Sequence, residues 1–317
     1  MTGLIAWTSA EWRAAAESWL DERLAAAGIE RTGPVTQPRV RAWGTVLTAP
    51  TARGPVWLKA PAPETVFEVA LYELLGSIVP GRVLDPIAVD VSRGWVLLPD
   101  GGPVIANDDF AALARMLSSY GELQRAVASH VDDLLSFGVA DMRPAAMPAR
   151  FDEALEVARR LATDDDRPAL DRIAGMRAEF GEWCVRLAES PVPVSIDHND
   201  LHPGNMFASG TVYDWGDSVV AHSFTSMLVA LGYLNIRHGF GPGDPVVERV
   251  RDAYLEPFTD LAPRAELVAE LAVACRVAKV ARTLTWARAV RLDPGDFARA
   301  PLETLLGLEA HWMSLRR

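Results

Sequence analysis

The chain has 317 residues, of which 50% are hydrophobic and 23% are charged; this composition is typical of a globular protein and excludes an intrinsically disordered one. Its 31 lysines and arginines against 42 aspartates and glutamates give a formal net charge of -11, which makes nucleic acid a poor candidate partner. An acidic surface favours a cationic small molecule, although acidity more often only keeps a protein soluble. A chain of this length usually folds into two lobes with a site between them.

The start of the chain and its two cysteines carry no sign of export. The segment from Met1 to Trp7 has no basic start, and no apolar run approaches the length of a membrane span. We therefore expect a cytoplasmic protein with no membrane partner. Cys184 and Cys275 lie far apart in apolar helical patterns, so we expect them to be buried packing residues.

The first elements are a helix and a hairpin. The helix is expected to begin at Thr8, where Glu11 completes a capping box, and to end before Gly28. The β-rich runs 39–48 and 55–60, joined by a turn, predict the hairpin.

A helix and two more strands follow. The run 64–81 has apolar residues at helical spacing and is closed by Gly76 and Pro80. The apolar runs 83–91 and 94–102 predict two strands, and the second ends in a breaker. The expected order is strand, strand, helix, strand, strand and then a flexible joint.

The remainder is expected to be helical, except for one patch. Helical periodicity extends from Asp108 to Ser190 and resumes beyond His222. Between these regions, the run 192–218 predicts three short strands, VSI, MF and TVY, joined by polar loops. Four polar side chains on these loops are placed to converge on one point: His198, Asp200, Asn205 and Asp214. Hard oxygen ligands around an open site suit magnesium that holds a nucleotide phosphate.

The patch contains HNDLHPGN at 198–205, followed by YDWGD at 213–217. These stretches resemble the H-G-D-x-H-x-x-N and I-D-[WF] signatures of the aminoglycoside phosphotransferase and choline kinase family. The resemblance implies an α+β, protein-kinase-like bilobal fold, with a small antiparallel-sheet lobe and a larger, mostly helical lobe. It implies a nucleotide-binding lobe with an extra helix over residues 1–101 and a catalytic, substrate-binding lobe over residues 102–317.

The resemblance also assigns roles to single residues. Asp200 would be the catalytic base, Asn205 a magnesium ligand, and Asp214 the counterpart of the metal-binding aspartate of D-F-G. Lys59 would hold the α- and β-phosphates, and Glu68, early in the next helix, would be its partner.

The resemblance places further nucleotide contacts in the first hundred residues. A hinge would offer its main chain to adenine through Leu97, Leu98, Pro99 and Gly101. A G-x-G-x-x-G loop is absent, so the expected phosphate contacts at the hairpin turn are Gly44 and Thr45. Asn199 stands where the family usually has glycine, and because Asn tolerates unusual backbone angles we expect the loop to be preserved.

Three residues are expected to have supporting roles. His198 would brace the aspartate by hydrogen-bonding the main chain, and His202 is expected to brace the same loop. Asp217 has three open alternatives, which are to brace the metal loop, to contact a cationic substrate, or to face solvent.

The function predicted from these residues is ATP-dependent phosphorylation of a hydroxyl on a small molecule, with Mg²⁺. An aminoglycoside, another hydroxylated antibiotic or an amino sugar is the first choice, and a metabolic kinase of choline, homoserine or methylthioribose type is the alternative. GTP as donor, the oligomeric state (monomer or homodimer) and a resistance or metabolic role stay open. A rival class is a zinc or manganese hydrolase with ligands among His198, Asp200, His202, Asp214 and His222. A non-catalytic nucleotide-binding module is the third class.

Overall fold

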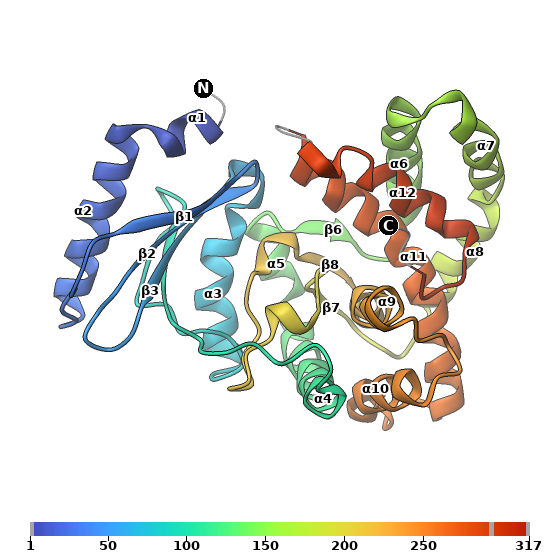
Figure 1. The fold of residues 1–317 in the computed structure, drawn as a ribbon. Coiled ribbons are helices and arrows are strands. Elements are labelled where there is room, and N and C mark those ends of the chain that lie inside the picture. Colours follow the sequence, from blue (N-terminus) through green and yellow to red (C-terminus); the bar gives the residue numbers. More distant parts are fainter. Residues whose placement is uncertain (1–2, 292–294, 315–317) are drawn as a thin grey trace.

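A computed structural model describes residues 3–291 and 295–314, and Figure 1 shows them as two lobes. The outermost residues of the two expected lobes, 1–2 and 315–317, lie outside the described residues. One lobe contains a five-stranded antiparallel sheet, and the other is mostly helical with a three-stranded sheet. This confirms the predicted α+β, protein-kinase-like fold class.

Within the described residues, the sheet lobe contains three α-helices and five strands. In chain order they are α1 Gly3–Thr8, α2 Ala10–Ala26, β1 Thr36–Arg41, β2 Gly44–Ala49, β3 Val56–Pro61, α3 Phe67–Ile78, β4 Ala88–Asp90 and β5 Trp95–Pro99. The strand order is β1-β2-β3-β5-β4, so β3 lies at the centre. Side chains alternate across β3: Leu58 packs on the α2 side, while Lys59 faces the opposite side.

The helical lobe surrounds a small mixed sheet. Its strands are β6 Ala140–Met142, β7 Val194–Asp197 and β8 Val219–His222, with β8 in the middle. Its helices are α4 Phe110–Val127, α5 Val131–Ser136, α6 Met147–Leu161, α7 Arg167–Gly175, α8 Arg177–Ala188, α9 Met227–His238, α10 Pro245–Leu255, α11 Arg264–Val290 and α12 Ala300–Leu306. The predicted helical character before Ser190 and after His222 is thus confirmed for the described residues.

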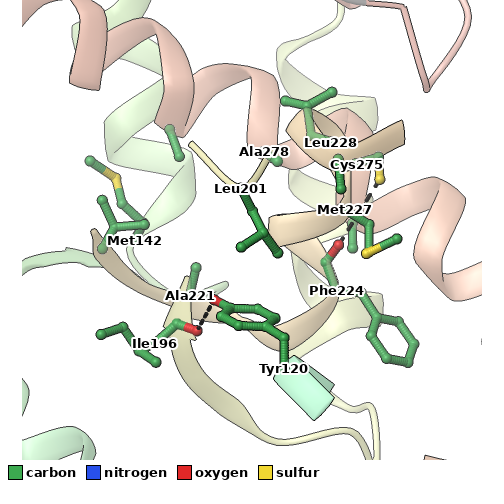
Figure 2. Close-up of a cluster of buried hydrophobic side chains, with 14 of the residues drawn as sticks. Tyr120, Met142, Ile196, Leu201, Ala221, Phe224, Met227, Leu228, Cys275 and Ala278 are labelled. Carbon is green, nitrogen blue, oxygen red and sulfur yellow. Dashed lines mark hydrogen bonds between the residues drawn. The ribbon is translucent and has the colours of Figure 1, made fainter. Parts of the chain in front are cut away.

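The core of the helical lobe lies directly beneath the loop that follows β7. Figure 2 shows Leu201 of this loop among Tyr120, Ile196 and Phe224, which come from three other segments. Leu201 stands between two polar residues in the sequence, and because it is fully buried it anchors the loop to the core. Cys184 and Cys275 are buried free cysteines, as predicted.

Three details of the sequence prediction were wrong. The first long helix begins after Ser9 and not at Thr8, because the Ser9 side chain accepts from the Trp12 N–H at 3.1 Å. The run 39–48 forms two strands, since the chain turns at residues 42–43, so the sheet has five strands instead of four. Of the three strands expected between 192 and 218, only the first forms a regular strand.

The sequence also failed to indicate β6 and β8. Both are very short, and all four residues of β8 are buried, so neither shows the alternation that marks a half-buried strand. The MF and TVY runs form isolated bridges, of which Met206 with Val212 is one. No helix in the described part of the chain is long and apolar enough to cross a membrane.

Candidate active site

Lys59 contacts one carboxylate from each lobe. Its ammonium group donates to Glu68 Oε1 of α3 at 2.6 Å and also contacts Asp214 of the helical lobe. Burial alone would lower the pKa of Lys59, but the charges of Asp214 and Glu68 outweigh it and raise this pKa. The lysine therefore carries a positive charge at neutral pH.

Glu68 is the buried partner of this lysine. Its side chain is only 1% exposed, at the second residue of α3. Burial raises the pKa of Glu68 to about 7, even though Lys59 acts in the opposite direction. The negative charge of Glu68 is therefore lost when the pH falls below neutrality.

The loop after β7 is held in an unusual backbone conformation. Asn199 has a φ of 60°, in the left-handed region, and its N–H donates to Asp197 Oδ1 at 2.7 Å. Asparagine adopts this region more readily than most residues, which explains why it can replace a glycine here. The expectation that the loop survives this substitution is in accord with this geometry.

Asp200 follows and is surrounded by hydrogen-bond donors. Arg282 Nη2 donates to Asp200 Oδ1 at 2.7 Å, and Asn205 Nδ2 donates to the Asp200 carbonyl at 2.9 Å. Burial alone would raise the pKa of Asp200, but the Arg282 guanidinium together with His202 and His198 outweighs it and holds this pKa below its usual range. The carboxylate is therefore ionised and able to accept a proton.

Asp214 lies on the second loop, which is tied to the first. Its φ of 67° is also left-handed. His198 Nε2 donates to the carbonyl of Tyr213 at 2.8 Å, so the two loops are joined immediately before Asp214. Burial alone would raise the pKa of Asp214, but Lys59 outweighs it and lowers this pKa. Within the described residues, Asn199 and Asp214 are the two non-glycine residues with positive φ, and both belong to this site.

His202 and Asp217 make bracing contacts. His202 Nδ1 accepts from the Gly204 N–H at 3.0 Å, and its ring stacks on Tyr233 at 5.5 Å between centroids. Asp217 accepts from Arg282 Nη1 at 2.8 Å. This bond links Asp217 to α11, and the Asp217 side chain remains 30% exposed. Burial raises the pKa of Asp217, although Arg282 opposes it.

A cavity of about 530 Å³ lies against these groups, a size suited to a small-molecule ligand. It is lined by Pro38, Arg39, Val46, Trp57, Lys59, Tyr72, Leu84, Leu98, Pro99, Asp100, Gly101, Gly102, Val104, Phe207, Tyr213 and Asp214. Lys59 and Asp214 therefore share one cavity with the expected hinge. Asp200 and Asn205 lie on the loop beside it and are joined to each other by hydrogen bonds.

Three of the predicted nucleotide contacts do not line this cavity. The main chain of Leu97 is used within the sheet, because Leu97 pairs with Leu58 of β3 and its carbonyl accepts from the Ile87 N–H at 2.7 Å. Thr45 is buried, and its hydroxyl donates to the Arg39 carbonyl at 2.8 Å. Gly44 lies against the next strand, where an added Cβ would come within 3.1 Å of the Ala60 carbonyl. Both residues are thus used in pairing β1, β2 and β3.

The sequence did not indicate several residues of the site. Phe207 and Tyr213 line the cavity with stacked rings whose centroids are 4.4 Å apart. Gly101 makes room for them, since an added Cβ would lie 2.2 Å from the Phe207 ring. Arg282 was recognisable only as a basic residue of a late helix. An aromatic residue adjoining each polar motif is the one available signal for the stacked pair.

The donor set suits a metal that reaches the site together with phosphates. Asn205 and Asp214 offer an amide oxygen and a carboxylate, and the described residues contain no group of three His, Cys, Asp or Glu arranged to hold a metal. Magnesium typically takes one or two protein ligands and completes its shell with phosphates and water. The hydrolase alternative finds no support, because His222 is 1% exposed and lies 3.0 Å from Glu270.

Solved structures of small-molecule kinases share this fold. A macrolide 2′-phosphotransferase type I is 16% identical with a TM-score of 0.57, covering 92% of this chain and 97% of its own. An amicoumacin kinase, solved with AMP-PNP and Ca²⁺, is 15% identical with a TM-score of 0.57, over 94% and 95%. A choline kinase from Cryptosporidium parvum Iowa II is 15% identical with a TM-score of 0.61, over 97% and 94%.

The sequence itself provides the family assignment. No curated protein sequence matches the chain significantly. The model of the phosphotransferase enzyme family, APH, matches residues 36–267, a span that contains both polar loops, Lys59 and Glu68. Because this match covers most of the chain, the protein belongs to the APH phosphotransferase enzyme family and is a phosphotransferase that acts on a hydroxyl group of a small molecule.

Proposed function

We propose that the protein transfers the terminal phosphoryl group of ATP to a hydroxyl group of a small molecule, with Mg²⁺ as the metal. The observation that carries the proposal is the position of Lys59: it lies in the cavity wall, in contact with a carboxylate from each lobe. A compact ammonium group in such a place suits the phosphates of a nucleotide. We place the boundary between the nucleotide-binding and catalytic lobes after residue 101, at the cavity's glycine pair.

The proposed reaction divides the work among five side chains. Lys59, oriented by Glu68, binds the α- and β-phosphates. Asn205 and Asp214 would hold Mg²⁺, which supplies charge neutralisation on the phosphates. The ionised Asp200 accepts the proton of the acceptor hydroxyl while the hydroxyl oxygen attacks the γ-phosphorus. The bond from the γ-phosphorus to the bridging oxygen breaks, giving ADP and a phosphate monoester.

For the acceptor, we propose a hydroxylated antibiotic or an amino sugar. The sequence HPGN in the first loop and the structural likeness to macrolide and amicoumacin kinases support this choice. The likeness to a choline kinase keeps an amino alcohol as the second candidate. Acceptor choice depends on side chains outside the polar loops, so a broad panel is needed to identify it.

The test mixes the full chain with ATP or GTP, Mg²⁺ and a pool of antibiotics, amino sugars and amino alcohols. Mass spectrometry then detects a product that has gained one phosphoryl group. Asp200→Asn should lower kcat about 1,000-fold and leave nucleotide affinity within about twofold, because the base acts in the transfer step. Asp152→Asn removes a carboxylate that pairs with Arg177 on the surface and serves as the matched control. Undiminished turnover by Asp200→Asn would remove the base assignment.

A further inference from the structure

Arg282 of α11 joins the two polar loops. Its Nη1 donates to the Asn199 carbonyl at 2.7 Å and to Asp217 Oδ2 at 2.8 Å, while Nη2 donates to Asp200 Oδ1 at 2.7 Å. Its side chain is 8% exposed, and the guanidinium lies over the Trp286 ring at 4.8 Å from the centroid. A planar fork of donors is thus fixed on one face by an aromatic ring and at its edge by three oxygens.

We propose that Arg282 is the positioning residue for Asp200: its fork fixes the orientation of the carboxylate that receives the acceptor proton, and Asp217 holds the fork in place. The inference rests on the proposed function of Asp200. It adds a residue of a late helix, far from both motifs in sequence, to the set that phosphoryl transfer requires.

The contacts explain why an arginine is needed at this position. One guanidinium reaches oxygens of Asn199, Asp200 and Asp217 at the same time, and these belong to two separate loops. A lysine ammonium is a single point with no planar fork, so it cannot reproduce this set of directions. Two carboxylates share the one cation, so Arg282 stays bound to Asp217 when the acceptor hydroxyl approaches Asp200.

The position of Arg282 also predicts which step it affects. It does not belong to the described lining of the nucleotide cavity, whereas Lys59 and Asp214 do. Loss of Arg282 should therefore leave nucleotide binding intact and slow the transfer step. A displacement of a reacting group by about 1 Å is enough to lower a rate about 100-fold.

The experiment compares Arg282→Lys and Arg282→Met with Arg264→Met in the full chain. Arg264 lies on the same helix and also bonds a carboxylate, Glu256, and a main-chain carbonyl, that of Asp252, so its loss is a matched control. Three readings are taken: affinity for AMP-PNP with Mg²⁺, kcat for phosphoryl transfer, and hydrogen–deuterium exchange of residues 198–206. Arg282→Lys, which keeps a positive charge, covers the case in which Arg282→Met does not fold.

We expect both Arg282 variants to lose about 100-fold in kcat, to keep AMP-PNP affinity within about twofold, and to exchange faster in 198–206. Equal losses of kcat and of affinity, full activity in Arg282→Lys, or unchanged exchange would each overturn the inference. The unsubstituted protein reports on the proposed function separately. If it transfers no phosphoryl group, that function fails, and exchange in 198–206 alone decides whether Arg282 holds Asp200.

Discussion

Two cations organise the site, the half-buried Lys59 and the buried Arg282, and each lies between two carboxylates. Lys59 contacts Glu68 and Asp214, and Arg282 contacts Asp200 and Asp217. The Lys59–Asp214 contact joins residues 155 positions apart, one in each lobe. The contacts of Arg282 all lie within the helical lobe.

The difference between the two cations follows from their chemistry. A lysine ammonium is a compact charge on a flexible stem, so it can exchange a carboxylate for a phosphate when a nucleotide enters. An arginine fork is planar and fixed by several directed bonds, so it suits a group that must keep one orientation. The compact cation thus lies in the cavity wall, and the planar cation contacts the loop after β7.

The largest expected effect, on ATP affinity, comes from a substitution that breaks the contact between the lobes. Asp214→Ala removes both a counter-charge of Lys59 and a proposed Mg²⁺ ligand, so ATP affinity with Mg²⁺ should fall about 100-fold. Without Mg²⁺, affinity should change little. Calorimetry with and without the metal measures both values.

Asp217→Ala is the matched control, because it removes one carboxylate from Arg282 in place of Lys59. It should preserve the gain in ATP affinity that Mg²⁺ provides. If both variants lose that gain equally, the two cations do not have separate tasks.

A smaller effect concerns pH. Burial raises the pKa of Glu68 to about 7, so as the pH falls through 7 the carboxyl takes up a proton and the charged hydrogen bond that orients Lys59 is lost. Nucleotide affinity should therefore decline about tenfold on acidification, which is the size expected when one charged hydrogen bond is lost. The stability of the fold depends on pH in the opposite direction. A raised carboxyl pKa favours the folded state at acid pH, and this contribution disappears as the pH rises through about 7.

Glu68→Gln isolates this titration. Its nucleotide affinity should be low at every pH and should lack the step near 7, apart from the titration of the nucleotide itself. A step of unchanged size in this variant would show that another group is responsible.

The smallest effect tests the far end of the cavity. In Gly101→Ala the new Cβ would overlap the Phe207 ring, which must then move. We expect the free energy of unfolding to fall by about 1–2 kcal/mol, as in other overpacked sites. Denaturant unfolding measures it, and Gly102→Ala is no control because Gly102 has a φ of 80°. Gly181→Ala, on a helix with open space around it, serves instead and should not destabilise the fold.

The sequence predicted the part of the site that depends on local spacing. Asp200 and Asn205 lie five positions apart on one loop, and Lys59 and Glu68 lie nine apart on a strand and the next helix, so short patterns indicate them. The left-handed backbone at Asn199 is likewise a local property.

The sequence did not predict what depends on distant segments. Arg282 reaches Asp200 across 82 positions, and its helix has no motif that distinguishes this arginine from its neighbours. The pairing of Thr45 and of the Leu97 main chain within the sheet depends on strand register, which a single sequence does not fix. The short buried strand β8 was missed for lack of any alternation.

A crystal structure with AMP-PNP and Mg²⁺ tests the central claim most directly. We predict that the phosphates lie within about 3 Å of Lys59 Nζ, that Asn205 and Asp214 bind the metal, and that the adenine ring lies beside Leu98 and Pro99. A nucleotide bound elsewhere on the protein, or a lysine still held by both carboxylates with the phosphates out of reach, would contradict the account.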